Sequence, residues 1–128
     1  MQTKDGHIPM FSRVAPSIYI ADIDRALRFY RDVLGFSLEC IDEPPMRAVV
    51  TQGSAILHFD LQPAKADSSR THIMVDDLDG VCERLRRAGT DLIQQPTIQE
   101  WGLRDIAVAD PDGNVFELAE PVRKPASA

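Results

Sequence analysis

The sequence predicts an α+β domain that spans residues 1–128 and is built from two tandem β-α-β-β-β modules. Three observations carry this prediction. The order of strand and helix signals in residues 14–61 returns in residues 70–120, each helix signal starts at an aspartate, and a polar connector separates the two halves. Each module is too small to bury a core of its own. We therefore expect the modules to bury their faces against each other or against a partner chain.

The first module starts with an extended run, "SIYI", that leads to Asp22. Aspartate is a favoured helix N-cap, because its carboxylate accepts hydrogen bonds from the free amides of the first turn. Apolar residues recur at helical spacing from Ile23 to Leu34, and Gly35 is expected to end the helix. Three extended segments follow, separated by a Pro-Pro pair and by a glycine: "FSLECI", "RAVVTQ" and "SAILHFDL".

The second module repeats this order after the connector "PAKADSSR". In "THIMVDDLDGVCERLRRAGTDLI", Asp77 takes the place of Asp22 and Gly89 that of Gly35, so a second helix is expected between them. Strands are predicted over "DLIQQPT", "RDIAVA" and "VFELA". The last two are joined by "DPDGN", where the proline and Gly113, which can adopt a positive φ, favour a tight hairpin turn.

The last strand carries a carboxylate, Glu117, between the apolar residues Val115 and Ala119 on the same face. Alternation predicts that Phe116 and Leu118 point to the opposite face. A lone strand glutamate is most often exposed or held in a salt bridge, and it can also be an acid that faces a ligand. The strand pattern alone leaves both interpretations open.

Charge and hydropathy exclude some classes of partner. Lys and Arg number 14 and Asp and Glu number 20, which gives a net charge of -6, and no basic run is present that could follow a phosphate backbone. We expect no nucleic-acid partner. No apolar run reaches transmembrane length and the first residues lack the pattern of a signal peptide, so a cytoplasmic protein without a membrane partner is expected.

Cys40 and Cys82 lie far apart in apolar stretches and are interpreted as small core residues.

Three stretches, "IADIDRALRFYRDVLGF", "VDDLDGVCERLRRAG" and "WGLRDIAVADPDGNVFEL", resemble the vicinal oxygen chelate superfamily. This group includes glyoxalases, extradiol dioxygenases, fosfomycin-resistance enzymes and bleomycin-resistance proteins. The resemblance runs from about Val14 to Pro121, and "WGLRD" followed by "DPDGN" is most similar to the bleomycin-resistance branch. It implies a curved, cup-shaped mixed β-sheet with the helices on its outside. The fold by itself does not assign a chemistry, because one fold hosts many functions.

The metal-binding members of that family hold the ion with one residue from the first and one from the last strand of each module. The resemblance places His58 and Glu117 at two of these positions, and Ala15 and Arg70 at the other two. Alanine has no donor atom and arginine is cationic, whereas a catalytic divalent site needs about three protein ligands. We therefore expect no metal cofactor.

Because Ala15 and Arg70 cannot bind a metal ion, two arrangements around Glu117 are possible. Without a metal, His58 and Arg70 are expected to lie near Glu117 across the cup floor, where a cation keeps a carboxylate ionised. The alternative is one divalent ion, such as Zn, Fe, Mn or Ni, held by His58, His72 and Glu117. His72 lies two residues beyond Arg70 on the same strand face, and two histidines with one carboxylate are the ligands of non-haem iron sites.

Two aromatic residues and one arginine are further candidates for ligand binding. Tyr19 is expected on the cup side of the first strand, and Trp101 in the loop before the seventh strand. The Trp101 ring either closes over a flat ligand or anchors its loop on the sheet. Arg104 either reaches an anionic substrate or, as we favour, forms an ion pair that holds the Trp101 loop.

The preferred functional hypothesis is a small-molecule binding protein of the bleomycin-resistance type. It would sequester a flat, polar or cationic organic ligand in a metal-free cup at a homodimer interface of more than about 1,200 Å², with antibiotic resistance as the corresponding role. The negative net charge favours a cationic ligand, because it raises the encounter rate. The alternative is a metal-dependent glyoxalase-like lyase or isomerase, or a dioxygenase, that acts on vicinal oxygens and uses Glu117 as a proton relay. A third hypothesis is a metal-free enzyme with His58 as the base.

Overall fold

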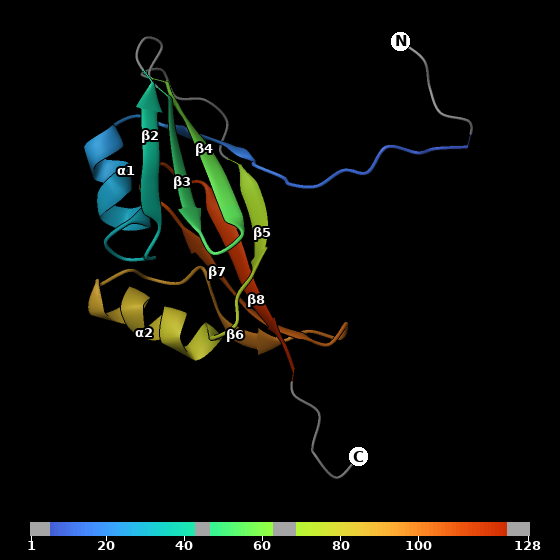
Figure 1. Ribbon diagram of the computed structural model, residues 1–128. Helices are drawn as coiled ribbons and strands as arrows, with labels where there is room; N and C mark the ends of the chain where they lie inside the picture. Colours follow the sequence, from blue (N-terminus) through green and yellow to red (C-terminus); the bar gives the residue numbers. More distant parts are fainter. Residues whose placement is uncertain (1–5, 43–46, 63–68, 123–128) are drawn as a thin grey trace.

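The computed structural model describes residues 6–42, 47–62 and 69–122, and it contains the two predicted modules (Figure 1). The first module consists of β1 (Ser17–Ile20), α1 (Ile23–Tyr30), β2 (Ser37–Asp42), β3 (Arg47–Gln52) and β4 (Ala55–Leu61). The second consists of β5 (Arg70–Met74), α2 (Leu78–Arg87), β6 (Gln94–Ile98), β7 (Leu103–Ala109) and β8 (Val115–Pro121). The α+β class and the repeated strand and helix order are confirmed.

Each module forms a four-stranded mixed sheet. The strand order is β1-β4-β3-β2 in the first sheet and β5-β8-β7-β6 in the second. The first strand of each module runs parallel to its last strand, which places Ser17 beside His58 and His72 beside Glu117. The remaining neighbours in both sheets are antiparallel. β1 and β5 are therefore edge strands at equivalent places in the two sheets, and β2 and β6 form the opposite edges.

Both helices begin where the sequence predicts. The Asp22 side chain accepts hydrogen bonds from two amides in the first turn of α1, and the Asp77 side chain accepts one from the first turn of α2. α1 ends at Tyr30, and the chain continues in turns to Gly35, which has a φ of +85°. Neither helix in the described part of the chain is long and apolar enough to cross a membrane.

The two modules share one hydrophobic core, which confirms that they bury their faces against each other. Alternate residues of both sheets and the inner sides of both helices form a single buried cluster. The fully buried Tyr30 ring packs edge-on against Phe116 of the second module, with ring centroids 5.7 Å apart, and lies 4.8 Å from Phe59 of the first. Since one face of each sheet covers this core, the opposite face of each sheet points away from it.

The "DPDGN" turn between β7 and β8 joins the second module to the first. The buried Asp110 carboxylate accepts a hydrogen bond from the Tyr30 hydroxyl of α1 at 2.5 Å, and two from the backbone and side-chain amides of Asn114 at 2.8 and 2.9 Å. The Asn114 side chain donates to the Tyr19 carbonyl of β1 and accepts from the Ser69 amide ahead of β5, both at 3.0 Å. We call Asp110, Asn114 and Tyr30 the inter-module clamp.

Gly113 has a φ of +86°, as the predicted turn requires, and its amide donates to the Asp110 carbonyl at 3.1 Å. The space around it is open, since among the described residues no heavy atom beyond Gly113 and its two chain neighbours lies within 4 Å of the place a Cβ would take. We expect Gly113→Ala to lower the free energy of unfolding by about 1 kcal/mol or more, because the left-handed backbone is strained for alanine. Urea unfolding measures this. Gly113→Asn, which tolerates that conformation better, should recover part of the loss, and an unchanged midpoint for Gly113→Ala would contradict the prediction.

One of the two cysteines differs from its prediction as a core residue, whereas Cys82 packs against the shared core. Both are free, Cys82 is only partly buried in α2, and Cys40 is exposed on the edge strand β2. The core assignment of Cys40 is wrong because of an irregularity in β2 after Leu38. The register shifts there, so that Cys40 pairs with Val49 on the outward face instead of with Ala48 on the core face. Burial raises the pKa of the Cys82 thiol, which makes it a poor nucleophile near neutral pH.

Candidate functional site

The predicted ligand residues lie on the faces of the two sheets that point away from the shared core. His58 and Tyr19 alternate with buried core residues along β4 and β1, so both lie on the outer face of the first sheet. Arg70, His72 and Glu117 lie on the outer face of the second sheet, with His72 directly beside Glu117 in the register. A single chain therefore holds these residues as two separate groups.

Arg70 and Glu117 form an ion pair on the outer face of the second sheet. The Arg70 Nε donates to Glu117 Oε1 at 2.5 Å, and the two side chains are 66% and 31% exposed. This is the neighbour that the sequence predicts for Glu117, whereas His58 lies on the other sheet. An exposed pair of this kind contributes only about 0–1 kcal/mol to stability. The pair matters for the chemistry of the site, because the permanently charged Arg70 guanidinium is hydrogen-bonded to one oxygen of the Glu117 carboxylate.

The residues at the four family positions do not fit a divalent metal. Ala15 offers no donor atom, and the Arg70 guanidinium beside Glu117 repels a cation. That leaves His58, which lies on the outer face of the other sheet. Among the residues that the structure describes, no three or more His, Cys, Asp or Glu side chains come close enough together to hold a metal ion. The alternative set of His58, His72 and Glu117 is therefore not assembled within one chain.

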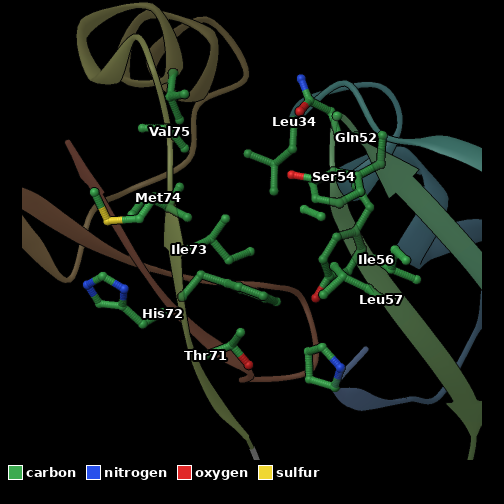
Figure 2. A pocket seen from close by; sticks show the side chains of 18 of the residues that line it. Leu34, Gln52, Ser54, Ile56, Leu57, Thr71, His72, Ile73, Met74 and Val75 are labelled. Carbon is green, nitrogen blue, oxygen red and sulfur yellow. The ribbon is translucent and has the colours of Figure 1, made fainter. Parts of the chain in front are cut away.

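A cleft with a volume of about 920 Å³ opens between β4 of the first module and β5 of the second (Figure 2). Its base is the shared core. Its walls carry half-buried apolar side chains from both modules, namely Leu34, Ile56, Ile73 and Val75. Figure 2 shows Thr71 and Ile73 on the cleft side of β5, whereas His72 points to the other side of the strand. Arg70 and His72 nevertheless belong to the lining of the cleft, so the open edge of β5 borders both the cleft and the outer face of the second sheet.

The cleft is the feature that sequence reasoning missed. Ile73 and Leu34 have the periodicity of core residues in their own modules, and this is all that a local pattern reveals. Whether two core faces meet fully or leave a gap depends on the distance between the modules. No signal within either module reports that distance.

The two aromatic candidates are accessible to a ligand. Trp101 lies in the turn between β6 and β7 with 68% of its surface exposed, so its ring does not anchor the loop on the sheet of the same chain. Tyr19 is 38% exposed on β1. Both rings therefore keep a face that can pack against a flat molecule.

Arg104 forms ion pairs within the chain, as we favoured, but its partners lie on α2 and β8 and not in the Trp101 loop. Its guanidinium donates to Asp79, in the first turn of α2, at 2.9 Å and to Glu120 of β8 at 3.1 Å. The hydrogen bond that Arg104 donates to Asp79 is the main cause of the raised pKa of Arg104. Since two carboxylates occupy the guanidinium, it links β7, β8 and α2 and is not aimed at an anionic ligand.

Known proteins related to this chain share its sequence pattern over most of its length. The sequence profile of the Glyoxalase/Bleomycin resistance protein/Dioxygenase superfamily matches residues 10–118. The lactoylglutathione lyase of Haemophilus influenzae is 29% identical and the match covers 79% of this chain and 86% of that protein. A probable lactoylglutathione lyase of Synechocystis sp. is 26% identical, with 84% and 93% covered.

Solved structures share the fold. The bleomycin-binding protein complexed with bleomycin superposes with a TM-score of 0.74 at 24% identity, covering 86% of this chain and 98% of that one. TioX from Micromonospora sp. superposes with the same TM-score and identity, covering 88% and 100%. Fold likeness and the profile match agree. The chain belongs to the Glyoxalase/Bleomycin resistance protein/Dioxygenase superfamily.

Proposed function

We propose that the protein binds and sequesters a small organic ligand, in the manner of the bleomycin-resistance branch, in a metal-free cup between two copies of the chain. The outer face of the first sheet of one copy would face the outer face of the second sheet of the other. His58 and Tyr19 of one copy and Arg70, His72 and Glu117 of the other would then line one site. Each chain of a two-fold dimer would contribute to two such sites.

The Arg70–Glu117 ion pair is the observation that carries this proposal. A metal that polarises a substrate oxygen needs several protein donors and an open coordination position, and here a guanidinium takes the place of one donor. The pair instead offers a ligand both kinds of hydrogen-bonding group. The remaining N–H groups of Arg70 can donate, and the second oxygen of Glu117 can accept. This suits a polar molecule that carries acceptors and donors close together.

The ligand class follows from the surrounding charge and aromatic side chains. The net charge of -6 attracts a cation and speeds its encounter with the protein. The exposed rings of Tyr19 and Trp101 can stack on a flat group or lie against a cationic one. The bleomycin-binding protein, which shares this fold, binds an organic ligand of that name. We therefore propose a flat, polar or cationic organic compound as the ligand.

The second candidate function is a lyase, isomerase or dioxygenase that uses a divalent metal. The names of the curated relatives, which are lactoylglutathione lyases, favour it. His72 also lies beside Glu117 in the register, so a second copy that brought His58 to them would assemble two histidines and one carboxylate. A metal-free reaction with His58 as the base is a third candidate.

The two main candidates differ in metal content. We expect the purified protein to contain well under one equivalent of Zn, Mn, Fe or Ni after mild dialysis, measured by elemental analysis. Added metal should barely shift the melting temperature, because a weakly bound ion stabilises little at ordinary concentrations. Stoichiometric metal that disappears in both His58→Ala and Glu117→Ala would overturn the binding-protein proposal in favour of the enzyme.

The same preparation tests ligand binding. Flat cationic aromatic compounds should raise the melting temperature and quench the fluorescence of Trp101, the single tryptophan of the chain. Trp101→Ala should weaken their binding by about 1 kcal/mol or more, and the matched variant Trp101→Phe should retain most of it. Melting curves follow binding where the tryptophan is absent. Equal affinities for wild type and Trp101→Ala would remove Trp101 from the site.

A further inference from the structure

The outer face of the second sheet carries a carboxylate besides Glu117, namely Asp105 of β7. Its neighbours along the strand point to the other side of the sheet, since Arg104 reaches α2 and Ile106 belongs to the shared core. By alternation Asp105 points to the outer face, where it is in register with Ala119 of β8. The residue is only 4% exposed, so its carboxylate is a buried charge at the proposed ligand site.

Neutral groups hold the Asp105 carboxylate in place. The side-chain amide of Gln94 donates to Oδ1 at 2.6 Å, and that of Gln99 donates to the same oxygen at 3.0 Å. Among the residues that the structure describes, no Lys, Arg or His forms an ion pair with Asp105, and no group donates to its Oδ2. Buried charges in proteins are normally paired with an opposite charge. Within the described chain, this one has no cationic partner.

Glu117, the other carboxylate on this face, already has a cation in Arg70. In the register of β7 and β8, Glu117 lies beside Ala107, one pair of outward-facing residues away from Asp105 and its neighbour Ala119. The two carboxylates are therefore diagonal neighbours, with backbone positions roughly 7–8 Å apart. Both alanines are almost completely buried. Because each has only a methyl side chain, a ligand can approach the sheet closely beside the carboxylates.

We propose that Asp105 binds the cationic group of the ligand, and that this group is an ammonium or amidinium whose N–H bonds donate to Oδ2. The inference rests on the proposed ligand site and narrows its ligand class. A hydrogen bond between an N–H cation and a carboxylate is roughly twice as strong as one between neutral groups. A quaternary ammonium has the same charge but no N–H, so it cannot form this bond.

The hairpin turn that carries Trp101 is attached to the same carboxylate. Gln99 precedes the turn and Asp105 follows it, so the hydrogen bond between their side chains joins the two strands at the base of the turn. A ligand whose cation rests on Asp105 can extend toward the exposed Trp101 ring. The arrangement favours a ligand in which a flat aromatic group is joined to an N–H cation.

Three probes of similar size separate charge from hydrogen bonding. Benzamidine is a flat aromatic amidinium, benzamide is its neutral counterpart, and phenyltrimethylammonium is a cation without an N–H. Wild type should bind benzamidine at least about tenfold more tightly than either of the others, measured by isothermal titration calorimetry at one ionic strength. A Kd for benzamidine no lower than those of the other two would overturn the assignment of Asp105.

Asp105→Asn tests the residue directly. The variant removes the charge but keeps an oxygen that can accept from Gln94 and Gln99, so the fold should be retained, as circular dichroism will show. It should raise the Kd of benzamidine at least about tenfold and change that of benzamide by less than about threefold. A variant that prefers benzamidine as strongly as wild type does would overturn the proposal. If the variant does not fold, the wild-type comparison of the three probes decides.

Glu83→Gln is the matched control for the change in net charge. It removes one carboxylate from α2, where Glu83 is exposed and pairs with Arg86 and Arg87 outside the ligand site. Since an exposed charge on another element contributes little at ordinary ionic strength, both Kd values should stay as in wild type. A rise for benzamidine equal to that in Asp105→Asn would assign the effect to net charge and overturn the proposal.

The inference and the proposed function fail in different ways. If none of the three probes binds and larger flat cationic compounds leave the melting temperature unchanged, the ligand site is rejected and the role of Asp105 with it. If flat compounds bind but the three probes have equal Kd values, only the role of Asp105 is rejected. The binding function then stands.

Discussion

Asp110→Ala is expected to lower the free energy of unfolding by at least about 3 kcal/mol, a large part of the stability of a typical domain. The residue is 5% exposed, and its carboxylate accepts hydrogen bonds from the Tyr30 hydroxyl and from both amides of Asn114. Alanine leaves these donors buried without an acceptor, at about 1–3 kcal/mol each. Tyr30 belongs to the first module and Asn114 to the second, so the loss weakens the contact between them.

Urea unfolding followed by circular dichroism measures this change. The matched control is Asp32→Ala, because the Asp32 side chain is 53% exposed and pairs with the neighbouring Arg31. The control should change stability by no more than about 0.5 kcal/mol. A loss below about 1 kcal/mol for Asp110→Ala would show that the inter-module clamp is not required for folding.

Stability is expected to fall by about 1.4 kcal/mol per pH unit above about pH 10 because of Tyr30 alone. Burial, and to a smaller degree the Asp110 carboxylate, raises the pKa of Tyr30 far above its ordinary value of about 10. Above pH 10 the unfolded chain releases this proton and the folded protein keeps it, so rising pH favours the unfolded state. Below pH 10 both states hold the proton, and the contribution to stability is fully present.

Tyr30→Phe separates this effect from the other groups that titrate at high pH. At neutral pH the variant should be less stable by about 1.5–3 kcal/mol, since a hydrogen bond to a charged group is lost. Above pH 10 the unfolding free energy of the variant should fall less steeply with pH than that of wild type. The difference in slope should be about 1.4 kcal/mol per pH unit, which corresponds to one proton. Urea unfolding at a series of pH values gives both slopes. Equal slopes would mean that Tyr30 ionises alike in the two states.

Features that depend on a few neighbouring residues could be predicted from the sequence. Asp22 and Asp77 cap the two helices, and Gly113 takes the positive φ of the hairpin turn. Side-chain alternation in β8 placed Glu117 on the face opposite the core, where it has Arg70 as its partner. Each of these depends on local backbone geometry, which neighbouring side chains determine.

Predictions that counted along a strand failed where the strand is irregular. Cys40 was expected in the core, and the irregularity after Leu38 turns it outward. A one-residue shift moves every later side chain to the other face. No residue near Cys40 marks the position of that shift, because pairing with β3 determines it.

The sequence by itself determined that the chain forms two like modules. Through the family resemblance it also showed that the set of four metal-ligand positions is incomplete, because Ala15 and Arg70 occupy two of them. Only the tertiary structure decided how the modules meet. It separates His58 from Glu117, buries Asp110 between the modules and leaves a cleft beside β5. These features depend on contacts between residues far apart in the chain, such as Tyr30 and Asp110. Periodicity identifies which residues are buried, but it carries no information about which distant side chains they will contact.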